Sequence, residues 1–155
     1  MVGIVTLAPV ASLSAQDPLA GLLAQYQYEA DPVRKARVLS KLGDGQIEEA
    51  RKELKAGEDV ASLQTIEKYR DEVRETVAKL EAAVPNAEKK PAGYKELQIA
   101  MRETIRHIDE LILTLPVDKR PFFRDVRDEL AKIQNDLIDA LFPRRPNQVP
   151  KKANE

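Results

Sequence analysis

The chain has 155 residues, enough for one domain with a substantial core and too few for two. Charged residues make up 33% and aromatic residues 5%, with no tryptophan, which favours amphipathic helices over an aromatic-rich β-sandwich. The net charge of −1 argues against a general attraction to nucleic acid or to an acidic membrane. The absence of cysteine excludes disulfides, a thiol nucleophile and cysteine-bound zinc.

Residues 1–16 carry no charge and run from a short apolar stretch into small residues, which is typical of a secretory signal with a cut near Ser14 or Ala15. Basic residues that usually precede the apolar stretch are missing, which suggests that the true start lies upstream. The apolar run is well short of the roughly 20 residues that span a membrane. We therefore expect a truncated signal peptide and an exported protein, periplasmic or extracellular. The alternative is a disordered apolar N-terminus.

Two Asp-Pro pairs predict helix starts, because aspartate caps free backbone N–H groups and proline suits the first helical position. Asp17 opens a short helix and Asp31 opens a long one. Apolar residues stay in phase along the long helix, so we expect it to continue through Gly43 and Gly45. A kink there is the alternative, since each glycine costs about 1 kcal/mol relative to alanine. The in-phase positions are Ala36, Leu39, Gly43, Ile47, Ala50 and Leu54.

The clearest pattern is an apolar stripe between residues 60 and 84, which predicts a second long helix. Gly57 fits the left-handed position after the first long helix, with Glu58 or Asp59 capping the second. Residues 32–56 hold seven basic and four acidic side chains, and residues 58–84 hold seven acidic and four basic ones, so we expect charge pairing between the arms. The stripe consists of Val60, Leu63, Ile66, Tyr69, Val73, Val77, Leu80 and Val84.

A second hairpin follows the helix-breaking segment 85–91, PNAEKKP. The short connection 116–118 predicts that its two helices are antiparallel. Residues 17–142 are therefore expected to form one all-α domain, an antiparallel four-helix bundle with a short N-terminal helix, followed by a disordered, proline-rich basic tail at 143–155. The hairpin's two stripes are Tyr94, Leu97, Met101, Ile105, Ile108, Ile112 and Leu115, then Phe123, Val126, Leu130, Ile133, Leu137 and Leu141.

No catalytic or cofactor motif is present, and we expect neither catalytic residues nor a cofactor. His107 is the only histidine of the chain. With Glu103 and Glu110 it is a weak candidate for a metal site. The alternative is a histidine on the flank of a helix, paired with Glu103. A di-iron bundle is excluded because it needs two Glu-x-x-His motifs.

Basic clusters are candidates for binding an acidic partner or an anionic surface, and solvated charge is the alternative. Nucleic acid is disfavoured as a partner, because no aromatic side chain that could stack on a nucleobase lies among these basic residues. The candidate partner-binding residues are Arg34, Lys35, Arg37 and Lys41 in the first long helix, and Arg144 and Arg145 in the tail.

Residues 36–73 contain Ala36-Arg37, Leu42-Gly43, Glu49-Ala50, Ala56-Gly57, Leu63 and Tyr69. In this pattern the segment resembles small exported bacterial helical proteins of unknown function. The resemblance implies an extracytoplasmic helical module and brings no active-site residues.

The leading hypothesis is a non-enzymatic interaction protein of the cell envelope that binds a protein partner through a helix face or groove. The first alternative is a periplasmic metal-responsive or stress-related helical protein that uses His107. An enzyme of unrecognised type comes third and would need a pocket with convergent polar groups. The stripes suit a monomer or a homodimer equally well.

Overall fold

The computed structural model describes residues 17–145, which form five α-helices and, within that range, no strand. The all-α prediction is confirmed. None of these helices is long and apolar enough to span a membrane. The predicted signal, 1–16, and most of the predicted tail, 146–155, lie outside the described residues. The helices are α1 (Pro18–Tyr28), α2 (Pro32–Lys55), α3 (Asp59–Ala83), α4 (Tyr94–Thr114) and α5 (Arg120–Leu141).

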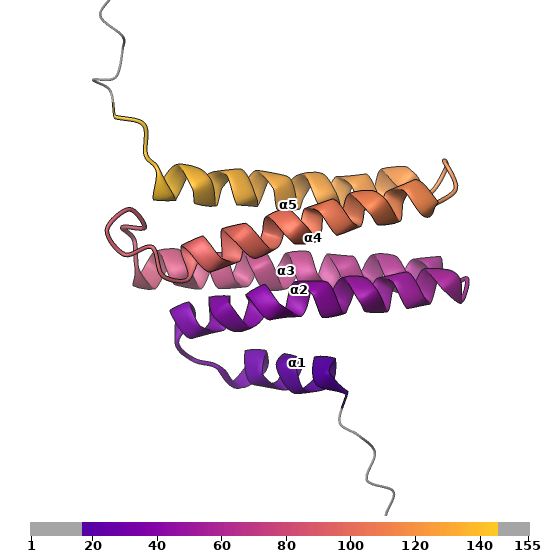
Figure 1. The fold of residues 1–155 in the computed structure, drawn as a ribbon, viewed down its shortest axis with the longest axis horizontal. Helices are drawn as coiled ribbons and strands as arrows, with labels where there is room; N and C mark the ends of the chain where they lie inside the picture. The colour runs from indigo at the N-terminus through magenta and orange to yellow at the C-terminus, as the bar shows by residue number, and fades with distance from the viewer. Residues whose placement is uncertain (1–16, 146–155) are drawn as a thin grey trace, which may run out of the picture.

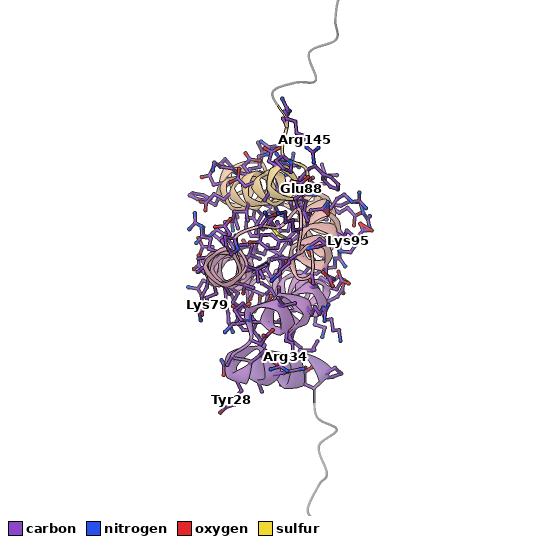
Figure 2. All side chains as sticks on the ribbon, turned by 90° about the vertical axis from the view of Figure 1, so that its left-hand side faces the viewer. Tyr28, Arg34, Lys79, Glu88, Lys95 and Arg145 are labelled. Carbon is purple, nitrogen blue, oxygen red and sulfur yellow. The ribbon has the colours of Figure 1, made fainter. Side chains whose placement is uncertain are left out.

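Helices α2 and α3 form one hairpin and α4 and α5 form another, with α1 packed against α2 (Figure 1). Seen along the helices, α5 lies above, α3 and α4 lie to either side, and α2 lies below with α1 beneath it (Figure 2). The turns of the two hairpins lie at the same end of the molecule (Figure 1). Consecutive helices therefore run in opposite directions, whereas the neighbours α2 and α4, and α3 and α5, run in the same direction.

The two Asp-Pro helix starts are confirmed, whereas the predicted side-chain cap at the start of α3 is not made. The Asp17 carboxylate accepts a hydrogen bond from the backbone N–H of Leu19 at 3.1 Å, and Asp31 accepts one from Arg34 at 2.8 Å. Proline follows each aspartate, as expected for a first helical position. Helix α2 then runs unbroken from Pro32 to Lys55, so the prediction of one helix through both glycines is also confirmed.

Gly57 ends α2 in the left-handed conformation predicted for it, with φ at +79°. The N–H of Glu58 donates to the carbonyl of Glu53 at 2.9 Å, and the N–H of Gly57 donates to that of Leu54 at 3.0 Å. These two bonds satisfy carbonyls that the helix end would otherwise leave free. The tight turn therefore follows from one residue without a Cβ.

The apolar stripes of α4 and α5 are buried as predicted, with Ile133 partly buried. The stripe of α3 needs a correction at Val60, which is 71% exposed. The core face of α3 includes Ser62 and Thr76 instead, because their hydroxyls find partners inside. Ser62 donates to the carbonyl of Ala50 at 2.8 Å, which lets α3 approach α2 closely. The buried positions of α3 are Ser62, Ile66, Tyr69, Val73, Thr76 and Leu80.

Charge pairing between the first two arms is weaker than the sequence predicts. Within residues 17–145, the ion pair that joins α2 to α3 is Lys35 with Glu75, at 3.8 Å. Since α2 also borders α4, two of its bases pair with that helix, Arg37 with Glu96 at 3.1 Å and Arg51 with Glu110 at 4.0 Å. The hairpin is held mainly by its apolar core and its turn.

Candidate interaction site

The three residues proposed as a weak metal site do not converge. Glu103 and Glu110 both pair with Arg106, at 2.9 and 2.5 Å, and the hydrogen bond and charge of that guanidinium lower the pKa of Glu103. His107 Nδ1 lies 3.6 Å from a carboxylate oxygen of Asp44 on α2. The predicted pairing of His107 with Glu103 is therefore wrong, because α4 packs its histidine against α2. Residues 17–145 hold no group of three His, Cys, Asp or Glu side chains arranged for a metal ion.

Lys35 was predicted to lie in an exposed basic cluster, and it is buried, with 6% of its surface exposed. Its Nζ lies 4.3 Å from the centre of the Tyr26 ring and 3.8 Å from a carboxylate oxygen of Glu75. The sequence could not show this, because the ring that covers Lys35 comes from α1. Lys35 is therefore a packing residue of the α1–α2–α3 junction, unavailable to a partner while α1 is in place.

The rest of the basic cluster on α2 lies at the surface. Arg34 pairs with Glu29 at 3.2 Å, and Arg37 pairs with Glu96 at 3.1 Å. Lys41 is exposed. Two of these three basic side chains therefore form intramolecular ion pairs. The cluster offers less unpaired positive charge to a partner than its sequence indicates.

The two tail arginines lie beyond the end of α5. Arg145 pairs with Glu88 of the connection between α3 and α4 at 3.0 Å (Figure 2). Arg144 is exposed and lines a shallow depression together with Arg145 and Glu88. This places the tail bases at the end of the molecule opposite the two hairpin turns (Figure 1).

An apolar depression of about 250 Å³ lies between α3 and α5 at the end that carries the hairpin turns. We call it the turn-end patch and define it by Val60, Leu63, Phe122 and Phe123. Phe123 is buried and Leu63 is half-buried, so they contribute to its floor, whereas Val60 and Phe122 are 71% and 60% exposed. Contiguous exposed apolar surface of this kind marks an interaction site more often than a scattered single residue does.

The charged rim of the turn-end patch is internally neutral. Lys119, just before α5, pairs with Asp59 in the first turn of α3. The hydrogen bond and charge of Asp59 raise the pKa of Lys119. This pair ties the second turn to the start of α3 and leaves the depression itself apolar. It therefore suits an apolar side chain better than an ion.

Sequence reasoning did not find the turn-end patch. Val60 was assigned to the core because it fits the spacing of the α3 stripe, and the structure places Ser62 there instead. The available signal was Phe122-Phe123, because two consecutive aromatics on a helix cannot both face one core. Only Phe123 turns inward.

Other depressions in residues 17–145 have more polar linings. The one between the ends of α2 and α4, about 420 Å³, is bordered by Arg51 and Glu110, which pair with each other at 4.0 Å. A third, about 320 Å³, lies at the opposite end near Ile99 and Phe142. Its polar lining includes Gln98, whose carbonyl oxygen is buried without a hydrogen-bond partner.

Comparison with known proteins adds no family assignment. No protein-family model matches the chain, and neither a curated protein nor a solved structure matches it significantly. A function is therefore inferred from the surface of the molecule and its sequence.

Proposed function

We propose that this protein is a non-enzymatic interaction protein of the cell envelope that binds a partner protein at the turn-end patch. The observation that carries the proposal is the exposure of Val60 and Phe122 beside an apolar depression. Burying a large apolar side chain contributes about 1.5–3 kcal/mol, so a partner that covers both residues gains several kcal/mol. Interfaces concentrate their binding energy in a few such anchors.

The partner that fits is an amphipathic helix laid across the turn-end patch, where α3 and α5 begin. A helix places apolar residues every three or four positions on one face and can insert one of them into the depression. The paired charges of Asp59 and Lys119 offer no net field to an anionic lipid or nucleic acid.

The proposal includes the fold and the compartment. Helices α2 to α5 form a four-helix bundle whose shared core consumes their apolar stripes, so a partner must bind at the outer surface. Residues 1–16, uncharged and apolar, support export to the periplasm or the cell exterior. In that compartment the absence of cysteine removes any dependence on disulfide formation.

Paired substitutions test the proposed surface. Phe122→Ser and Val60→Ser should each weaken binding of the partner isolated from envelope extract by at least about tenfold, about 1.4 kcal/mol. Leu113→Ser is the matched control, because Leu113 is 72% exposed on α4 and does not line the turn-end patch. Equal affinities of all three variants and the unmodified protein in titration calorimetry would refute the assignment.

A further inference from the structure

Helix α1 is a self-contained element. Asp17 caps its start, Asp31 caps the start of the next helix, and residues 29–31 connect the two. Its leucines are half-buried, and Tyr26 is its one fully buried residue. Little apolar surface therefore holds α1 in place, compared with the shared core of α2 to α5.

Tyr26 of α1 is held by a polar site on α2 and α3, which we call the seat of α1 and define by Lys35, Glu72 and Thr76. The Tyr26 hydroxyl donates to the carbonyl of Glu72 at 3.0 Å and lies 2.9 Å from the hydroxyl oxygen of Thr76. Lys35 places its ammonium 4.3 Å from the centre of the ring. If α1 left, water could solvate Lys35, Thr76 and the nearby carboxylate of Glu75, so an empty seat is tolerated better than an exposed apolar core would be.

Charge complementarity favours an occupant like α1 itself. Residues 17–31 contain three acidic side chains and no basic one, whereas residues 34–41 of α2 contain four basic and no acidic side chains. Glu29 and Arg34 already form one pair across this boundary, at 3.2 Å. Two of these acids, Asp17 and Glu29, flank α1, whose own residues 18–28 carry no charge. A second copy of the chain offers the same flanking acids with the same leucine and tyrosine spacing.

The connection between α1 and α2 can open without backbone strain. Glu29 and Asp31 both have extended backbone, with ψ of 115° and 121°. The closed form is clamped by the Glu29 carboxylate, which accepts from the Asp31 N–H at 3.0 Å and from Arg34 Nε at 3.2 Å. Release of this clamp permits a straighter connection about 10 Å long.

We propose that α1 exchanges between two copies of this chain, so that Tyr26 of each copy occupies the seat formed by Lys35, Glu72 and Thr76 of the other. The exchanged dimer repeats the contacts between α1 and its seat twice and gives up only those of the connection, which is the low-cost route to a dimer. The short connection gives α1 a high effective concentration at its own seat, so exchange rises with protein concentration.

A disulfide between chains tests the exchange, and the chain has no cysteine to interfere. A Cβ built at Gly45 lies 3.9 Å from the Cβ of Leu19, within the range of about 3.5–4.5 Å that disulfides require. One full-length chain carries Leu19→Cys. The other carries Gly45→Cys with Leu19→Ala, because the new Cβ would lie 2.9 Å from Leu19 Cδ1. After mixing and mild oxidation, this disulfide can form only between two chains.

Exchange predicts a mixed covalent dimer on a non-reducing gel, with a yield that rises up to about tenfold for a tenfold rise in concentration. Adding Glu29→Ala to both chains should raise that yield further, whereas adding Glu48→Ala, which removes a partner of Arg51 within α2, should not. The collision control replaces the acceptor by a Gln64→Cys chain, whose cysteine lies on the exposed surface of α3. Circular dichroism verifies that every variant is helical. Equal yields from the Gly45→Cys and Gln64→Cys acceptors at all concentrations would overturn the proposal.

Discussion

Three helices meet at Gly43, and the absence of a side chain there sets how closely they pack. A Cβ at this position would overlap the hydroxyl oxygen of Thr104 on α4 and lie 3.2 Å from that of Tyr69 on α3. Tyr69 is fully buried, and burial raises its pKa to about 12. The glycine is therefore a packing residue, which explains why α2 carries it despite its low helix propensity.

Gly43→Ala should destabilise the protein although alanine favours helix. Overpacking against Thr104 costs about 1–3 kcal/mol, which exceeds the gain in helix propensity of about 1 kcal/mol. Adding Thr104→Ala should recover part of the loss, since it removes the overlapping atom. Urea unfolding measures both, with Gly21→Ala as control, because a Cβ at Gly21 meets nothing within 4 Å. Equal stability of Gly43→Ala and Gly21→Ala would contradict this packing.

Tyr26→Phe should weaken the seat of α1. The variant loses both hydrogen bonds of the hydroxyl and leaves Thr76 without that partner, for a net loss of about 0.5–1.5 kcal/mol. Amide hydrogen exchange of α1 should accelerate accordingly. Tyr28→Phe is the control, since that side chain is 87% exposed and its effect should stay within about 0.5 kcal/mol. Unchanged exchange in Tyr26→Phe would argue against the tyrosine as the anchor.

Glu72 gives a pH dependence with a defined sign. Burial raises the pKa of Glu72 above its ordinary value of 4.5, with Gln46 and Lys68 opposing the shift. The folded protein therefore binds this proton more tightly than the unfolded chain, and ionisation destabilises the fold. The stability of Glu72→Gln relative to the unmodified protein should rise as pH increases from 4.5 through the raised pKa, then level off. A difference that stays constant in urea unfolding across this range would contradict the assignment.

At the scale of single residues, the burial of polar side chains could not be predicted from the sequence. Ser62, Thr76, Thr104 and Gln46 occupy core positions, yet each looks like surface in a hydrophobic pattern. Their burial depends on local and distant partners. Ser62 bonds the carbonyl of Ala50 on another helix, whereas Thr104 bonds the carbonyl of Ala100 on its own. A pattern along one helix cannot reveal which hydroxyl will meet a partner from the next.

Among the elements, helix ends were predictable because their signals are local. An aspartate before a proline at residues 17 and 31, and a glycine after the last apolar residue at 57, act within one turn of chain. By contrast, the prediction that Val60 is buried was wrong, because few neighbouring residues cover the first turn of α3. Lys35 was misread because the element that covers it is α1.

Gly57→Ala isolates the contribution of the turn. A Cβ there meets nothing within 4 Å, so the cost arises only from the left-handed backbone, about 1–2 kcal/mol for a residue with a Cβ. Gly57→Asn should cost less, because asparagine tolerates this conformation. Thermal unfolding ranks the three proteins, and an alanine variant as stable as the glycine would show that the turn adopts another conformation.

At the scale of the whole molecule, the sequence predicted helices that alternate in direction but not which helices of the two hairpins lie side by side. Apolar stripes show that each helix has a partner, and short turns pair α2 with α3 and α4 with α5, but nothing in them sets how the hairpins stack. The connection 84–93 does so. Gly93 has φ at +87°, Ala87 is buried, and the Tyr94 hydroxyl donates to the carbonyl of Val84 at 2.6 Å. These contacts hold a connection that brings α4 beside α2.

The turn-end patch also belongs to this scale, since it exists only where two hairpins meet. Val60 follows the first turn and Phe122 follows the second, and parallel stacking of α3 and α5 places them at one depression. A bundle with the hairpins reversed would separate these side chains by the length of a helix. The proposed binding at this site therefore depends on a stacking that the sequence did not reveal.

The most direct test of the turn-end patch as a partner-binding surface is site-specific photocrosslinking in cells that export the protein. A photoreactive residue in place of Phe122 should yield one crosslinked product, with the crosslink on an amphipathic helix of the partner, and Val60→Ser should abolish it. The same residue in place of Leu113 should yield no such product. If positions 122 and 113 crosslink alike, or if the product from position 122 persists unchanged in Val60→Ser, the turn-end patch is not the binding surface.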